Sequence, residues 1–205
     1  IYLIKEYYKK NNLFFICSFL FLILSIPAIY FAKSTGGLVG VAAGIIILLL
    51  SWKKTRWPIC LASLVGLVCL ASLPSSNPIK QELLLQDRSG QIRIQMWAET
   101  IEFLSDRPII GAGLASYQKL IYPYRIDKWI EVFHHPHNIF LTMWVNLGIL
   151  GLFGFVWIVV WFFRAGILHI AEHKTFNTLT TFLMTTMITF MTTGLVDSPY
   201  IKNDL

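Results

Sequence analysis

Long, uninterrupted apolar blocks dominate the chain. The blocks cover residues 13–32, 36–52, 57–73, 138–163 and 178–196 and are nearly free of charge. A helix needs ~20 apolar residues to cross a bilayer, with ~17 tolerated. A buried helix of a soluble protein rarely runs this far without a polar face. The pattern therefore predicts an all-α, polytopic membrane protein with five spans and one long polar loop over residues 74–137.

The composition is typical of a membrane protein and argues against a soluble domain or a nucleic-acid-binding protein. Only 14% of the residues are charged and 56% are hydrophobic, whereas about a quarter of an ordinary soluble domain is charged. The net charge of +6 forms no basic stripe interleaved with aromatic residues, so a nucleic-acid partner is not expected. All three cysteines lie inside apolar blocks without a CxxC pair, which favours packing over metal binding or disulfides.

The basic residues also indicate an orientation. They gather before the first block, between the second and third, and between the fourth and fifth, and positive charge in short loops marks the cytoplasmic side. Loop 74–137 and the tail 197–205 are then expected on the outer side. Because the chain begins at Ile1 and ends just after a polar turn, we interpret it as part of a longer protein.

Within the outer loop we expect one helix from about Gly90 to Ser105, capped by Ser89. Its apolar positions recur at helical spacing and should lie on the membrane surface or against the spans; they are Ile94, Trp97, Ile101 and Leu104. Arg88 and Arg93 belong to the same segment. By pattern alone they are solvated or contact lipid headgroups, although arginine can also bind phosphate through two hydrogen bonds.

Small residues mark two of the blocks. Gly36, Gly40 and Gly44 recur every four residues, a spacing that allows two helices to approach closely. We interpret the glycines of the fourth block in the same way; these are Gly148, Gly151 and Gly154.

Histidines provide the candidate chemistry. His134, His135 and His137 follow one another at the end of the outer loop, and clustered histidines can bind zinc. Neighbouring histidines project differently, however, and no cysteine or HExxH motif completes the set, so a metal is disfavoured. The segment 169–173 matches the HxxEH pattern of a zinc-peptidase group, but a short connection between two spans leaves no room for a third ligand or a cleft.

His137 differs from the others by its place after Pro136, which suits the first turn of a helix. A helix N-terminus disfavours imidazolium, so a neutral His137 could accept a proton. The same helix end can bind an anion such as phosphate. A base, an anion site and a membrane interface suggest chemistry on a lipid-linked phosphate.

At these residues the chain resembles the bacterial O-antigen ligases and polymerases. His137-Asn138, nine residues, Gly148, two residues and Gly151 match the family's mark. Arg93, three residues and Trp97, followed by the Pro-x-x-Gly-x-Gly segment 108–113, match a second pattern. The tail 194–200 with Lys202-Asn203-Asp204 is also similar. The resemblance covers nearly the whole chain, 1–205, as a single ligase-like membrane domain.

The resemblance implies a fold of the glycosyltransferase C type and a metal-independent, cofactor-free glycosyltransferase in the bacterial inner membrane. Its site would face the periplasm or the cell exterior. The donor would be a glycan on undecaprenyl diphosphate and the acceptor a sugar hydroxyl. His137 would be the general base and Arg93 a diphosphate ligand, with Arg88, His135 and Asn138 as further candidates for substrate contacts. No Asp-x-Asp pair occurs, which suits a mechanism without metal.

One position departs from the family pattern. Where many members have Ser-Arg-Gly, this chain has Ser34-Thr35-Gly36, so an arginine expected to hold diphosphate is missing. Lys33 could supply the charge as a point cation.

Two other classes compete with the enzyme. A transporter or flippase of lipid-linked saccharides would also have many spans, but such proteins tend to place ionisable residues at mid-depth, and these spans contain almost none. A structural membrane protein would tolerate the loss of His137.

Overall fold

The computed structural model describes residues 12–31, 34–173 and 178–198, and every element in these ranges is a helix. Lys33 and residues 199–205 of the family-like tail lie outside the described residues. The elements in chain order are α2 (Asn12–Phe31), α3 (Thr35–Leu50), α4 (Arg56–Ser72), α5 (Pro78–Leu83), α6 (Arg88–Asp106), α7 (Tyr117–Ile121), the 3-10 helix η1 (Tyr122–Tyr124), α8 (Ile139–His173) and α9 (Thr178–Gly194).

Each of the five apolar blocks forms a helix, and most of the helix ends fall within two residues of the predicted ones. The exception is α8, which runs through the segment 169–173 to His173. That segment is therefore the end of a helix and not a connection. Five membrane crossings remain a prediction, because among the described residues one helix, Ile139–Glu172, is long and apolar enough to cross a membrane.

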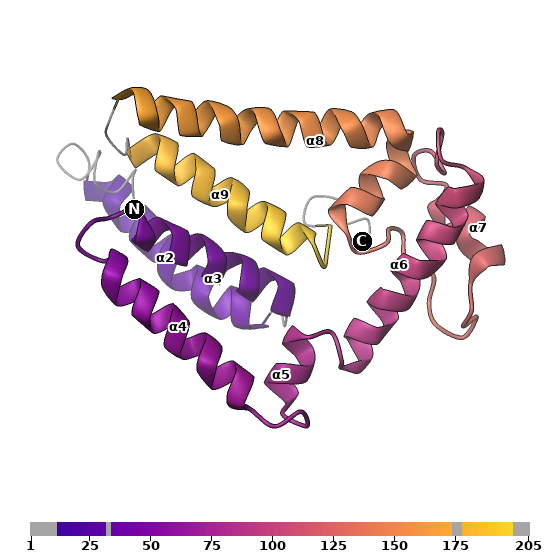
Figure 1. Ribbon diagram of the computed structural model, residues 1–205, viewed down its shortest axis with the longest axis horizontal. Coiled ribbons are helices and arrows are strands. Elements are labelled where there is room, and N and C mark those ends of the chain that lie inside the picture. The colour runs from indigo at the N-terminus through magenta and orange to yellow at the C-terminus, as the bar shows by residue number, and fades with distance from the viewer. Residues whose placement is uncertain (1–11, 32–33, 174–177, 199–205) are drawn as a thin grey trace.

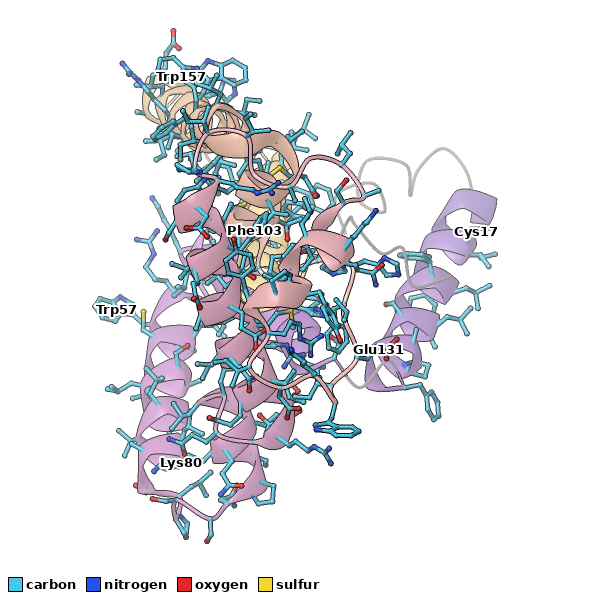
Figure 2. The ribbon with its side chains drawn as sticks, turned by 90° about the vertical axis from the view of Figure 1, so that its right-hand side faces the viewer. Cys17, Trp57, Lys80, Phe103, Glu131 and Trp157 are labelled. Carbon is cyan, nitrogen blue, oxygen red and sulfur yellow. The ribbon has the colours of Figure 1, made fainter. Side chains whose placement is uncertain are left out.

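Apolar surface on α8 associates the protein with a membrane. Only 11% of the most apolar part of this helix is buried inside the protein, so it is not the core helix of a soluble domain. Figure 2 shows Trp157 on α8 and Trp57 on α4 pointing away from the other helices, and both are more than 70% exposed. Burying such surface in lipid is favourable.

Helix α9 packs between α3 and α8 (Figure 1). The glycine stripe makes its approach to α3 possible. A Cβ atom on Gly40 would lie 2.8 Å from the carbonyl oxygen of Thr189, and one on Gly44 would collide with the hydroxyl of the same threonine. The prediction that Gly36, Gly40 and Gly44 form a helix-packing face is confirmed.

The outer loop is folded rather than extended. Its core lies between α6, α7 and the first part of α8 and consists of Phe103, Leu104, Tyr117, Ile121 and Val145. Helix α6 confirms the helix expected there, but two details differ. Asp87, not Ser89, caps it by accepting from the backbone N–H groups of Ser89 and Gly90. Ile94 and Ile101 are about half exposed, since the buried face includes Met96, Thr100 and Phe103 instead.

The Pro-x-x-Gly-x-Gly segment, residues 108–113, docks where α8 breaks. Gly148 adopts φ 71° and ψ −176° inside α8, and a Cβ atom there would collide with the carbonyl oxygen of Ile109. Across the break, Ile149 N donates to Ile109 O at 3.1 Å, and Ala112 N donates to Val145 O at 2.7 Å. Gly148 therefore makes a kink and not the helix-packing surface that the sequence suggested. A Cβ atom on Gly154 would meet nothing within 4 Å, so no packing contact requires that glycine either.

Candidate active site

His137 lies just before α8 and not in its first turn. Helix α8 begins at Ile139, and the Asn138 side chain caps it by accepting from Phe140 N at 3.0 Å and Leu141 N at 3.1 Å. His137 has φ 49°, in the left-handed region that few residues other than glycine adopt. The expectation that a helix end keeps this imidazole neutral is therefore wrong in its geometry. Backbone strain of this kind is common at functional sites.

The group that contacts the His137 ring is the carboxylate of Asp197, not the N-terminus of a helix. His137 Nδ1 lies 3.1 Å from Asp197 Oδ1, and the two side chains are 18% and 15% exposed. A carboxylate accepts but cannot donate when ionised, so this contact places the proton of a neutral His137 on Nδ1. Nε2 then carries the lone pair and is the atom able to take a proton.

Hydrogen bonds next to the His137–Asp197 pair connect the start of α8 to the residues that follow α9. Asn138 Nδ2 donates to Leu195 O at 2.9 Å. Ser198 and Thr142 are buried, and their hydroxyl groups form a hydrogen bond of 2.8 Å. Asp197 Oδ1 also accepts from the Ser198 N–H at 2.7 Å. The position of Asp197 is thus set by contacts between two helix ends that are distant in sequence.

Asp197 is a site residue that the residue patterns alone did not reveal. In the sequence it lies in the family-like tail, and no motif there assigns it a function. The signal available was its position directly after an apolar block on the expected outer side, the same side as His137.

Two further aromatic rings surround His137. The ring of His135 lies 4.7 Å from that of His137, and Phe133 meets it edge-on at 5.0 Å. His135 is 2% exposed, whereas His134 points to solvent. Trp97 Nε1 donates to Pro136 O at 2.8 Å, which fixes this loop to α6. The Trp97 of the second family pattern therefore supports the histidine loop.

His135, His137 and Asp197 together could hold a metal ion, because one ligand atom from each lies within 4.8 Å of the others. In the sequence no third ligand lies next to the histidines, and a metal was not expected for that reason. The structure supplies one from 60 residues further along the chain.

Arg93 lines a different pocket on the same side of the protein. The pocket has a volume of about 160 Å³. Its lining combines polar side chains from four helices with the turn that precedes Asp197; it includes Thr35, Glu82, Arg93, Thr192, Leu195 and Val196. Arg93 Nη1 donates to Ser89 Oγ at 3.0 Å, and its Nε is buried without a hydrogen-bond partner. Because Leu195 and Val196 lead directly into Asp197, this pocket and the His137–Asp197 pair share one turn.

The remaining candidates lie in different surroundings. Arg88 is exposed at the first position of α6. Asn138 Oδ1 caps α8 and Asn138 Nδ2 donates to Leu195 O. Both polar atoms of this side chain therefore stabilise the fold. At the position of the family arginine, the Thr35 hydroxyl donates to the Glu82 carboxylate.

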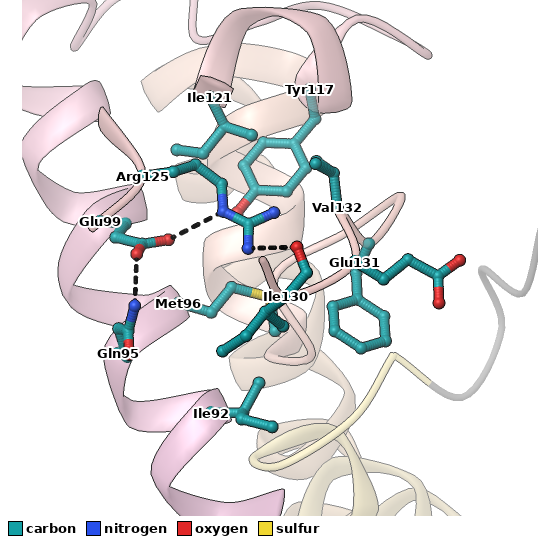
Figure 3. A pocket seen from close by; sticks show the side chains of 11 residues that line it. Ile92, Gln95, Met96, Glu99, Tyr117, Ile121, Arg125, Ile130, Glu131 and Val132 are labelled. Atoms are coloured by element: carbon teal, nitrogen blue, oxygen red, sulfur yellow. Dashed lines mark hydrogen bonds and ion pairs between the residues drawn. The ribbon is translucent and has the colours of Figure 1, made fainter. Parts of the chain in front are cut away.

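A second pocket, shown in Figure 3, lies between α6 and the loop after α7. Its volume of about 20 Å³ is room for about one water molecule. At its centre Glu99 lies 3.8 Å from Arg125 Nε and accepts from the backbone N–H of Ile126 at 2.9 Å. Tyr117 bonds to Thr100 at 2.7 Å, and burial raises its pKa to about 12, which keeps the phenol neutral. This buried network holds the outer loop on α6 and leaves no space for a glycan.

Comparison with known proteins matches part of the chain, including part of this site. The family model described as O-antigen ligase matches residues 20–156, which include Arg93, His137 and Gly148 but not Asp197. A protein of Rickettsia conorii (strain ATCC VR-613 / Malish 7), provisionally named polysaccharide ligase, is 30% identical over 87 residues. That match covers 40% of this chain and 21% of the relative, so the chain spans a small part of that protein's length. Since the family model covers about two thirds of the chain, the protein belongs to the O-antigen ligase family.

Proposed function

We propose that the protein is a membrane glycosyltransferase that moves a glycan from undecaprenyl diphosphate to a sugar hydroxyl, as an O-antigen ligase or surface-polysaccharide polymerase. The observation that carries this proposal is the His137–Asp197 pair at 3.1 Å, in a chain that belongs to the O-antigen ligase family. A histidine oriented by a carboxylate is a general base suited to a hydroxyl nucleophile.

The reaction transfers one proton and exchanges one bond. His137 Nε2 takes the proton of the acceptor hydroxyl while the hydroxyl oxygen bonds to the anomeric carbon. The bond from that carbon to the diphosphate oxygen breaks, its electron pair leaves with the diphosphate, and the configuration inverts. Asp197 stabilises the imidazolium that forms, because the proton on Nδ1 already points to its carboxylate.

Arg93 is our candidate for holding the leaving diphosphate. Its guanidinium borders the pocket that also contains Thr35 and Gly36 of the first turn of α3. Arginine binds phosphate oxygens through paired hydrogen bonds, and a helix N-terminus favours an anion. Glu82 in the same pocket carries a negative charge and accepts from the Thr35 hydroxyl. Among the described lining residues Arg93 supplies the positive charge for an anion. Arg88, which does not line the pocket, and Lys33, which lies outside the described residues, are proposed only as additional positive charges for binding the diphosphate.

The function is tested by the products of a strain that lacks the gene. For a ligase, long glycan chains should stay on the lipid carrier and be absent from the acceptor. For a polymerase, the acceptor should carry single repeat units. Gel separation of surface and carrier-linked glycans distinguishes the two, and a plasmid copy of the gene should restore the normal pattern. Normal surface glycan in the deletion strain would contradict both, and donor trapped on the cytoplasmic side would point to a flippase.

Replacing Asp197 with asparagine should lower kcat by about 10²-fold or more with little change in KM, because general-base catalysis contributes about 10²–10⁴-fold. The asparagine keeps the size of the side chain but removes the charge that stabilises the imidazolium. Transfer rates in detergent-solubilised protein measure both constants. The Asp197→Glu variant should recover part of the rate, and the exposed-loop variant Glu131→Gln should behave as wild type. A rise in KM with unchanged kcat would show that Asp197 does not position the base.

A further inference from the structure

We propose that His135, His137 and Asp197 form a zinc-binding site and that Zn²⁺ bound there inhibits the enzyme. The binding site stands on the geometry of these three side chains. Only its effect on transfer rests on the proposed function.

The three side chains are close to the spacing that one ion requires. Two ligand atoms on a tetrahedral zinc with bonds of 2.0–2.1 Å lie about 3.3 Å apart. His137 Nδ1 and Asp197 Oδ1 are already separated by 3.1 Å, and all three ligand atoms lie within 4.8 Å of one another. Small rotations of the His135 and His137 rings, whose centroids are 4.7 Å apart, would close the set.

The types of ligand select the metal. Two imidazoles and one carboxylate suit zinc and similar transition ions, whereas Mg²⁺ and Ca²⁺ prefer sets made of oxygen alone. Three protein ligands also leave the fourth zinc position open for water. The carboxylate offsets part of the ion's charge in a site that is largely buried, with His135 2% exposed.

Zinc would act through the tautomer of His137. In the metal-free protein the contact with Asp197 places the proton of a neutral His137 on Nδ1 and leaves the Nε2 lone pair available. When Nδ1 binds zinc, its proton goes to solvent and the neutral ring takes up a proton at Nε2. The imidazole then keeps its count of protons but has no lone pair left for the acceptor hydroxyl. Zinc and the acceptor proton thus compete for one side chain.

The direct test measures Zn²⁺ binding by the detergent-purified protein in competition with a chromophoric zinc chelator. We expect one site per chain, no competition by Mg²⁺, and weaker binding in His135→Gln, His137→Ala and Asp197→Asn. Losing a ligand should cost at least the roughly 10–100-fold that follows the loss of a supporting group. The His134→Ala variant is the matched control, because His134 is adjacent but exposed, and it should bind zinc as wild type does.

Gel filtration and an unfolding temperature check that each variant is folded. If His135→Gln does not fold, zinc binding is compared between the wild type and Asp197→Asn, because the Asp197 side chain is partly exposed. Unchanged zinc affinity in Asp197→Asn, or an equal loss in His134→Ala, would overturn the site. Zinc that fills the site should also stop transfer, and a chelator should restore it. Full transfer by the zinc-loaded protein would overturn the inhibition, and zinc binding by a protein without transferase activity would support the site while contradicting the proposed function.

Discussion

Replacing His137 with alanine should lower glycan transfer by about 10²–10⁴-fold, the contribution typical of a general base, while the amount of protein in the membrane stays normal. The side chain is 18% exposed, and its ring bonds to Asp197 and packs against the rings of His135 and Phe133. Its loss removes the base together with these contacts, so protein levels are matched before transfer is compared. Transfer of a labelled glycan by membranes with matched protein levels measures the effect.

His134→Ala is the control for this experiment, since it removes an exposed histidine of the same loop, three positions before His137. It should retain wild-type transfer. Activity retained in His137→Ala would remove the general-base assignment and leave the family membership intact.

The second large effect is expected from Gly148→Ala, which should destabilise the protein by about 2–5 kcal/mol. An alanine at φ 71° and ψ −176° is strained, and its Cβ would collide with the carbonyl oxygen of Ile109. Residues 108–113 would have to move, which breaks their hydrogen bonds to Val145 O and Ile149 N. With about 2–4 °C per kcal/mol for a chain of this size, the unfolding temperature should fall by roughly 5–15 °C.

Two glycines separate strain from collision in this test. Gly113 has φ 76° but open space at the Cβ position, so Gly113→Ala should show the cost of strain alone. Gly154→Ala meets neither problem, and it should be neutral or slightly stabilising because alanine is the better helix former. A drop in Gly148→Ala no larger than that in Gly113→Ala would show that the docked segment yields without cost.

The outer loop shows how far sequence patterns lead. The helix of α6 was predicted from its spacing, yet its buried face was not. Glu99 is 3% exposed because Arg125 and the Ile126 N–H meet it there, and a pattern of apolar residues cannot indicate a buried charge that is paired by a distant segment. Likewise, Ser89 and Asp87 are both good cap residues, and only the entry of the chain into α6 decides between them.

The sequence by itself determined the helical segments, the glycine face of α3 and the family motifs around His137 and Gly148. These properties depend on run length and spacing along one segment, so they can be read without knowing its neighbours. The tertiary structure alone decided that Asp197 meets His137, that His135 joins them, and that Gly148 bends α8 rather than packing it. Each of these depends on where one helix ends relative to another, and that is set by contacts between residues far apart in the chain.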